Sequence, residues 1–206
     1  MREKLTCSNR FALHAPFSEL FPCAIDPKVR EIAAERYHQT IAVAQGYGIQ
    51  KIIVHGGYNP RIYFPIWYTE QSVLFWKDFV QEIPDGMVFC LENVFEEEPA
   101  MLSQIVREVN DPKLRMCLDI GHVNAYSKIS VFDWLTECAG LIEHFHIHNN
   151  DTSRDSHSQL FEGTIPMTKL LTTIDEKCPS ATVTLELIDA NPSVDWLFRE
   201  ADLTWN

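Results

Sequence analysis

Residues 87–92, MVFCLE, form a run of five apolar side chains that ends in a carboxylate. Shorter apolar runs that end in a histidine or a carboxylate occur at residues 51–55, KIIVH, and at residues 114–119, LRMCLD. Continuously apolar strands suit a parallel sheet that is covered on both faces. We predict six strands, over Phe11–Ala15, Lys51–His55, Met87–Glu92, Leu114–Asp119, Ile142–His148 and Thr182–Leu187.

Helical segments separate these strands. The first is predicted to begin at Asp26 as N-cap, with Pro27 at the first helical position, and to end near Gly46 or Gly48. The others are predicted at about Ile66–Gln81, Pro99–Val109, Val131–Cys138, Pro166–Glu176 and Pro192–Arg199. Strands that alternate with helices imply parallel pairing with right-handed crossovers, in either a doubly wound sheet or a (β/α) barrel. No linker divides residues 1–206, so we predict one domain.

Composition narrows the classes of partner. The 206 residues carry a formal net charge of −12, which repels phosphate backbones and makes nucleic acid an unlikely partner. The sequence shows no signal peptide and no apolar run long enough to span a bilayer. The six cysteines contain no CxxC pair, which favours reduced thiols and a cytoplasmic location.

At or near the end of each predicted strand lies a residue that can bind a metal ion. A single histidine at a strand end is more often structural, because polar groups readily find hydrogen-bond partners. Such residues at the ends of all six strands indicate a common site, because the carboxyl ends of all strands in a parallel barrel converge on one face, where active sites lie. Imidazole and carboxylate without thiolate suit Zn²⁺, Mn²⁺, Fe²⁺ or Co²⁺. The residues are His14, His55, Glu92, Asp119, His146 and Glu186.

Further histidines and an aspartate extend this set. His122 follows Asp119 by three residues, about one helical turn, and Asp155 and His157 share one side of an extended segment. Residues 144–151, HFHIHNND, place histidines at alternate positions, so His144, His146 and His148 face one way in a strand. This pattern alone is compatible with either a polar edge strand or a metal site.

The motifs LHAP, VHGG, LENV, LDIGH, HIHNND, DSH, EG and LEL occur in this order along nearly the whole chain. In these motifs and their order, the chain resembles the xylose-isomerase-like TIM-barrel superfamily of sugar phosphate isomerases and epimerases. This superfamily also includes the endonuclease IV family. The resemblance implies a TIM (β/α) barrel. Related barrels carry two βα units before the HAP strand, and only ten residues precede Phe11 here, so we expect six strands and no first two units. We also expect copies of the chain to associate over the exposed strand edges.

The resemblance implies the following ligands. Endonuclease IV binds three zinc ions with nine ligands, which match His14, His55, Glu92, Asp119, His122, His146, Asp155, His157 and Glu186. The isomerases and epimerases bind one divalent ion through the subset Glu92, Asp119, His146 and Glu186, and the two glutamates transfer the proton. The cofactor is therefore expected to be Zn²⁺ or Mn²⁺, with one to three ions. His144 would lie deeper in the barrel, and His148 would be either a substrate contact at the rim or an exposed loop histidine.

Three functions stay open. We favour an isomerase or epimerase of a small sugar or sugar phosphate, in which Glu92 and Glu186 move a proton through an enediolate. The alternative is a zinc-dependent phosphoester hydrolase of the endonuclease IV type, and the third is an incomplete barrel that binds metal without turnover. Asn93 and Asn124 are expected to orient ligands. Tyr58, Arg61 and Trp67 follow the second strand and either bind substrate or pack over the barrel mouth.

Overall fold

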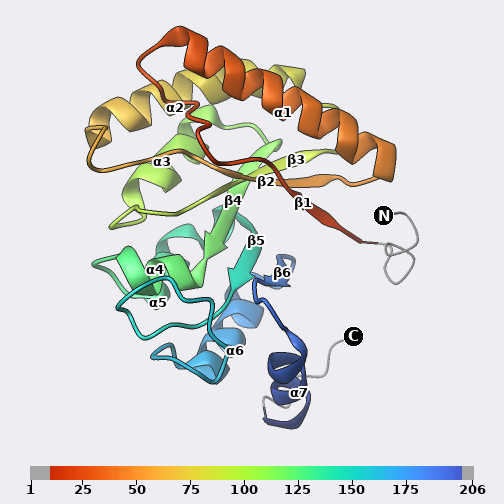
Figure 1. The fold of residues 1–206 in the computed structure, drawn as a ribbon, viewed down its shortest axis with the longest axis vertical. Coiled ribbons are helices and arrows are strands. Elements are labelled where there is room, and N and C mark those ends of the chain that lie inside the picture. Colours follow the sequence, from red (N-terminus) through yellow and green to blue (C-terminus); the bar gives the residue numbers. More distant parts are fainter. Residues whose placement is uncertain (1–9, 201–206) are drawn as a thin grey trace. The chain divides into compact units, whose positions relative to one another are not determined.

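Strands and helices alternate along residues 10–200, the part of the chain that the computed structural model describes (Figure 1). The strands are β1 (Ala12–His14), β2 (Lys51–His55), β3 (Val88–Glu92), β4 (Leu114–Asp119), β5 (Ile142–Ile147) and β6 (Thr182–Leu185). They follow one another in the sheet in chain order, from β1 to β6. The strand β2 pairs in parallel with both β1 and β3, and β5 pairs in parallel with β6.

Seven α-helices and two short 3₁₀ turns lie between these strands or, in the case of the last helix, after them in the described chain. They are α1 (Pro27–Tyr47), α2 (Pro65–Phe79), η2 (Val80–Glu82), α3 (Ala100–Val109), α4 (Ile120–Tyr126), α5 (Val131–Cys138), η3 (Ala139–Leu141), α6 (Met167–Lys177) and α7 (Asn191–Glu200). No helix within residues 10–200 is both long and apolar enough to cross a membrane.

The chain folds as two units, which are described separately. Unit 1 comprises Met1–Glu92 and Gln104–Met116, and unit 2 comprises Asn93–Ser103 and Cys117–Asn206.

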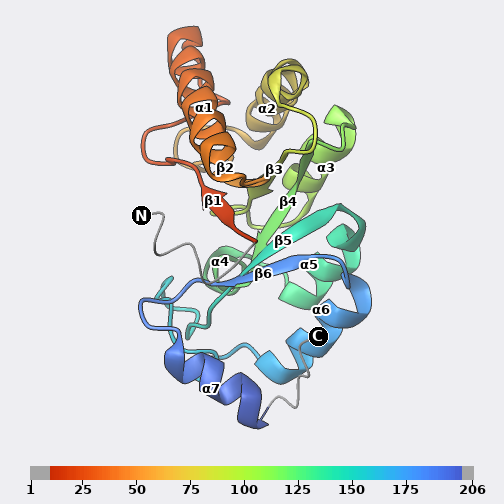
Figure 2. The ribbon, with the colours of Figure 1, turned by 90° about the vertical axis from the view of Figure 1, so that its right-hand side faces the viewer.

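In unit 1, α1 and α2 pack side by side against the sheet formed by β1, β2 and β3 (Figure 2). Tyr37 of α1 stacks on Trp76 of α2, with ring centroids 5.7 Å apart, and both rings contact Phe89 of β3. These side chains are almost fully buried. Burying each contributes about 1.5–3 kcal/mol to the stability of unit 1.

The predicted start and end of α1 are confirmed. Asp26 accepts a hydrogen bond from the backbone N of Lys28 at 2.8 Å, and Pro27 occupies the first helical position. Gly48 ends the helix with φ 70°, a left-handed conformation in which a side chain would be strained.

In unit 2, β5 pairs with β6, and its core contains Trp134 of α5, Phe145 of β5 and Leu170 of α6. The register sets His146 beside Thr184. The backbone N of Glu186 donates to the carbonyl of Ile147 at 3.2 Å, so the residue after β6 still follows the parallel pairing.

The six predicted strands are confirmed; two have the predicted ends, and the ends of the other four differ by at most two residues. His148 and Glu186 lie just beyond β5 and β6 rather than inside them. The helix α4 was not predicted, because its sequence, IGHVNAY, contains glycine and asparagine, which favour helices poorly. Asp119 compensates as its N-cap by accepting from the backbone N of His122 at 2.7 Å.

Candidate metal centre

The ends of the three strands in unit 1 bring His14, His55 and Glu92 together. The register places His55 directly opposite Glu92. The Nε2 atom of His14 lies 3.2 Å from Glu92 Oε2, and that of His55 lies 3.4 Å from the same oxygen. Glu92 is only 1% exposed, and the ring of Phe17 packs against both histidines. Two imidazoles and one buried carboxylate therefore meet at one point in unit 1.

A second group lies in unit 2, at the ends of β4, β5 and β6. It consists of Asp119, His146 and Glu186, whose ligand atoms all lie within 4.8 Å of one another. The Nδ1 atom of His146 is 3.3 Å from Glu186 Oε2 and 3.8 Å from Asp119 Oδ2. Asp119 and His146 are buried. These three residues form the carboxylate–imidazole set that a divalent cation prefers.

A third group, also in unit 2, consists of His122, His148, Asp155 and His157, again with ligand atoms within 4.8 Å of one another. Asp155 Oδ2 lies 3.2 Å from His122 Nε2 and 3.0 Å from His157 Nε2. His148 Nε2 lies 3.6 Å from Asp155 Oδ1 and 3.1 Å from Asp119 Oδ1. The rings of His148 and His157 stack with centroids 4.0 Å apart. Asp155 is thus surrounded by three imidazoles.

Asn93 orients two residues of these groups, as predicted. Its amide Nδ2 donates to the carbonyl of Asp119 at 3.0 Å, and its Oδ1 accepts from the backbone N of Asp119 at 2.8 Å. The carbonyl of Asn93 lies 2.8 Å from His122 Nδ1. Asn124, by contrast, donates to Asn150 and Thr164 rather than to a proposed ligand, so it supports the loop after β5.

Burial and the neighbouring charges shift the pKa values of His148 and Asp155, in the third group, in opposite directions. Burial alone lowers the pKa of His148, but the hydrogen bond to Asp119 and the charges of Asp119 and Asp155 together raise it above its ordinary value. Burial tends to raise the pKa of Asp155, but hydrogen bonding to His122 and the three neighbouring imidazoles lower it. Both shifts favour the charged forms of these side chains.

Within the described part of unit 2, three buried side-chain atoms have no hydrogen-bond partner: His148 Nδ1, Asp155 Oδ1 and Glu186 Oε2. Leaving buried polar atoms unsatisfied costs free energy, so such atoms call for an explanation. A cation in each of the two groups would bind Glu186 Oε2 in the second and Asp155 Oδ1 in the third, and so would account for both carboxylate oxygens. The residues present therefore fit a divalent metal ion.

The predicted ligands are gathered within each unit, three in unit 1 and six in unit 2. His144 is buried, as expected, with its ring nitrogens 2.6 Å from the Thr182 hydroxyl and 3.0 Å from the Thr184 hydroxyl. His148 is fully buried, so it is not an exposed loop histidine. Sequence reasoning missed Gly121, whose added Cβ would lie 1.9 Å from His148 Cε1.

The predicted substrate-binding residues in unit 1 have different surroundings. The indole N of Trp67 donates to the carbonyl of Cys23 at 3.1 Å, and the buried ring of Tyr58 packs on Tyr68. Arg61 is exposed. Contact of these side chains with a substrate stays a prediction.

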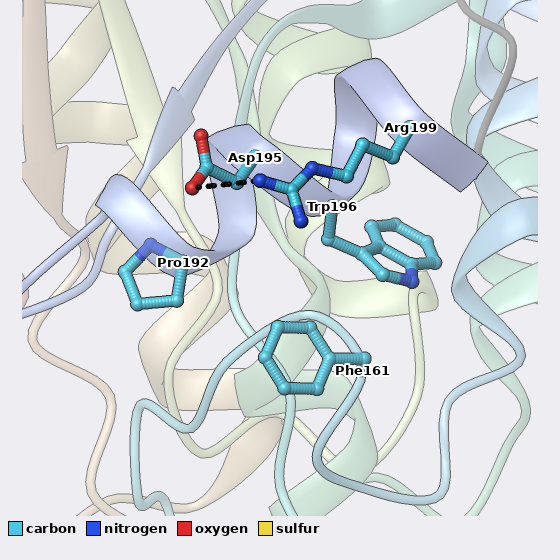
Figure 3. A pocket seen from close by; sticks show the side chains of 5 residues that line it. All are labelled: Phe161, Pro192, Asp195, Trp196 and Arg199. Carbon is cyan, nitrogen blue, oxygen red and sulfur yellow. Dashed lines mark ion pairs between the residues drawn. The ribbon is translucent and has the colours of Figure 1, made fainter.

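A separate pocket of about 460 Å³ lies at α7 in unit 2 (Figure 3). Phe161 and Trp196 face each other across it with ring centroids 6.4 Å apart, and Arg199 pairs with Asp195 at 3.8 Å. Its lining contains no predicted site residue.

Solved structures share this fold. The chain superposes on a D-tagatose 3-epimerase-like protein with a TM-score of 0.82 and 22% identity, covering 97% of this chain and 79% of the other. A protein of Thermus thermophilus, determined after soaking with ZnCl₂, gives a TM-score of 0.76 and 23% identity over 93% of this chain and 77% of the other. At these identities the likeness concerns the fold.

The family model of the xylose isomerase-like TIM barrel matches residues 2–204. The chain therefore belongs to this family, and its fold is a partial TIM barrel with six parallel strands.

Two curated relatives are similar in sequence. An uncharacterized protein of Methanocaldococcus jannaschii is 27% identical over 187 residues, which is 80% of this chain. The probable endonuclease 4 of Ureaplasma parvum serovar 3 is 28% identical over 182 residues, which is 79% of this chain. The chain spans 59% of the length of each.

Proposed function

We propose that this protein is a divalent-metal-dependent isomerase or epimerase that acts on a small sugar or sugar phosphate by proton transfer. The observation that carries the proposal concerns Glu186. Its buried Oε2 accepts no hydrogen bond and lies 3.3 Å from His146, in a group of residues that could hold a metal ion. A carboxylate in such a place is available both to a cation and to a substrate proton. The D-tagatose 3-epimerase-like neighbour supports a sugar as the substrate class.

The proposed ligands of the ion are Glu92, Asp119, His146 and Glu186. A divalent cation held there would supply Lewis acidity, which would polarise a substrate carbonyl and acidify the adjacent C–H bond. Zn²⁺ and Mn²⁺ both suit this ligand set.

Glu186 and Glu92 are proposed as the proton-transfer pair. One carboxylate takes the proton from the carbon beside the carbonyl, and the electron pair of the broken C–H bond forms the enediolate. The other carboxylate, protonated, returns a proton to the opposite face of that carbon, which inverts it. If the proton returns to the neighbouring carbon instead, and the hydroxyl proton passes to the former carbonyl oxygen, the carbonyl moves by one carbon. In unit 1, the His14 and His55 imidazoles beside Glu92 hold its carboxylate in place.

The test is a panel of ketoses, aldoses and their phosphates in ²H₂O, with Mn²⁺, Zn²⁺, Co²⁺ or Mg²⁺ added. Proton transfer through an enediolate predicts solvent deuterium in the product C–H bond, which NMR detects. Glu186→Gln should abolish the exchange while leaving the melting temperature of the metal-free protein almost unchanged. Glu176→Gln, an exposed glutamate on α6, is the control and should keep the wild-type rate. Full activity of Glu186→Gln would remove the assignment of the pair.

A zinc-dependent phosphoester hydrolase is the second candidate. The third group, with His122, Asp155 and His157, favours it, as does the similarity to a probable endonuclease 4. The net charge of −12 disfavours a DNA substrate, so a small phosphoester is the form that fits this chain. Release of p-nitrophenol from bis(p-nitrophenyl) phosphate, with no deuterium exchange on any sugar, would favour this candidate over the first.

A further inference from the structure

We infer that the aromatic pair Phe95 and Tyr126 forms the part of the substrate site that packs against the C–H face of a sugar. The inference rests on the proposed function and narrows its substrate class to pentoses and hexoses. A triose or tetrose has little C–H surface beyond its reacting carbons, so it would gain little from such a contact. Both residues belong to unit 2, and neither was predicted from the sequence.

The aromatic pair lies in two segments that follow strands of the sheet. Phe95 lies between β3 and α3, and Tyr126 is the last residue of α4, the helix that directly follows β4. The two rings meet edge to face, with centroids 5.0 Å apart. Segments after the carboxyl ends of the strands form the active sites of parallel barrels. The pair therefore occupies the kind of segment from which barrel enzymes contact their substrates.

Tyr126 borders the third group of the candidate metal centre. Its ring centroid lies 6.2 Å from that of His122. Partial burial and the charges of Asp155 and Asp119 raise the pKa of Tyr126, while a hydrogen bond with the backbone of Asp155 lowers it. The ring contact and these two carboxylates place the phenol at the edge of the metal-binding residues. A molecule bound at those residues would meet the aromatic pair.

Hydrogen bonds hold the aromatic pair in place from the backbone on both sides. The carbonyl of Glu97 accepts from the hydroxyl of Ser127 at 2.7 Å and from the backbone N of Lys128 at 2.8 Å. The side chains of Glu97 and Lys128 also form an ion pair. Oε2 of the buried Glu96 accepts from the backbone N of Val94 at 2.6 Å, which fixes the turn that carries the first ring. The segment after β3 is thus tied to the end of α4.

The exposure of these fixed rings suits a small ligand. Phe95 is 38% exposed and Tyr126 is 36% exposed. A sugar has an apolar face of C–H groups, and packing that face on an aromatic ring removes both from water. Rings that are already held in place lose little freedom when a ligand binds. A protein partner would need a much larger area, about 800 Å² on its side of a standard interface, than two half-exposed rings provide.

The test measures binding of D-tagatose and D-fructose, two ketohexoses, to the zinc-loaded full-length chain by saturation-transfer NMR. Phe95→Leu and Tyr126→Leu keep an apolar side chain but remove the ring face, so each should weaken binding by about 10-fold. Tyr126→Phe keeps the ring and should bind as tightly as wild type. In the deuterium-exchange assay, the two leucine variants should raise KM for the ketohexoses and leave kcat unchanged.

Two controls make the outcome specific. Phe198→Leu, which changes an exposed aromatic residue of α7, should leave sugar binding unchanged. Exchange on D-erythrulose, a four-carbon ketose, should have the same KM in wild type and in the leucine variants.

The outcomes separate the inference from the proposed function. If Phe95→Leu and Tyr126→Leu bind the ketohexoses as tightly as wild type, the inference is wrong, and continued deuterium exchange would uphold the proposed function. If the wild type binds them through the pair but exchanges no deuterium on any sugar, the proposed function is wrong and the inference stands. If the wild type binds neither ketohexose, the inference is wrong.

Discussion

At the scale of single residues, the structure shows how closely one glycine and one histidine depend on each other. Gly121 leaves the space that the ring of His148 fills, and its carbonyl accepts from Asn150 Nδ2 at 2.8 Å. The glycine was not recognised in the sequence because the motif DIGH says nothing about a ring that arrives from another segment, 27 residues later.

Gly121→Ala is predicted to displace the His148 ring. Overpacking of this kind costs about 1–3 kcal/mol, which urea denaturation of the metal-free protein should show. Gly140→Ala is the matched control, because a Cβ at that position would meet nothing within 4 Å. Equal stability of the two alanine variants would contradict the prediction.

The raised pKa of His148 predicts a pH dependence in chelator-treated protein. The folded state favours the protonated ring, so its stabilising contribution is fully present below the ordinary pKa of about 6.5 and is lost as pH rises through the higher folded pKa. The difference in melting temperature between wild type and His148→Gln should therefore be larger at pH 5.5 than at pH 9. A difference that does not change with pH would argue against a charged His148.

At the scale of elements, the loop of residues 149–165 is the part of the site that periodicity could not place. Asn149 and Ser158 form an isolated antiparallel bridge, and the amide of Asn149 donates to the carbonyls of Leu160 and Ile165. The hydroxyl of Ser193 in α7 accepts from the backbone N of Leu160 at 3.0 Å. The loop that carries Asp155 and His157 is thus held by hydrogen bonds within itself and by one to α7.

Ser193→Ala is expected to loosen this loop. It leaves the buried N–H of Leu160 without an acceptor and removes a hydrogen bond to Gln159, at a cost of about 1–3 kcal/mol. Hydrogen exchange should quicken within residues 149–165, and zinc should dissociate faster. Ser180→Ala, at an exposed serine, should change neither quantity. Unchanged exchange in the loop of the Ser193 variant would show that α7 does not hold it.

The strand ends were the most predictable part of the site. His14, His55, Glu92, Asp119 and His146 each end or nearly end a confirmed strand, because apolar runs show where a buried strand stops. The sequence could not show α4, whose start depends on the capping carboxylate of Asp119. Nor could it show that His148 is buried, since that depends on how the loop folds back.

At the scale of the whole molecule, a formal net charge of −12 and at least four buried or half-buried carboxylates favour cation binding. An ion that binds only the folded chain stabilises it by about 2.7 kcal/mol at one hundred times its Kd. For a chain of this size we expect ZnCl₂ to raise the melting temperature of EDTA-treated protein by about 5–10 °C per ion. CaCl₂, a cation that prefers oxygen ligands, should have much less effect. Equal shifts from both salts would indicate screening of charge rather than a site.

The contacts of His144 with the hydroxyls of Thr182 and Thr184 have a consequence for how this sequence can change over time. The two threonines alternate with half-buried Val183 and Leu185, an apolar pair that aligns β6 only weakly with β5. A shift by one residue would turn Glu186 to the opposite face of the sheet. Replacing both threonines by valine would keep β6 apolar but remove the contacts that fix its register, so the chain could fold with the Glu186 carboxylate on the wrong face of the sheet.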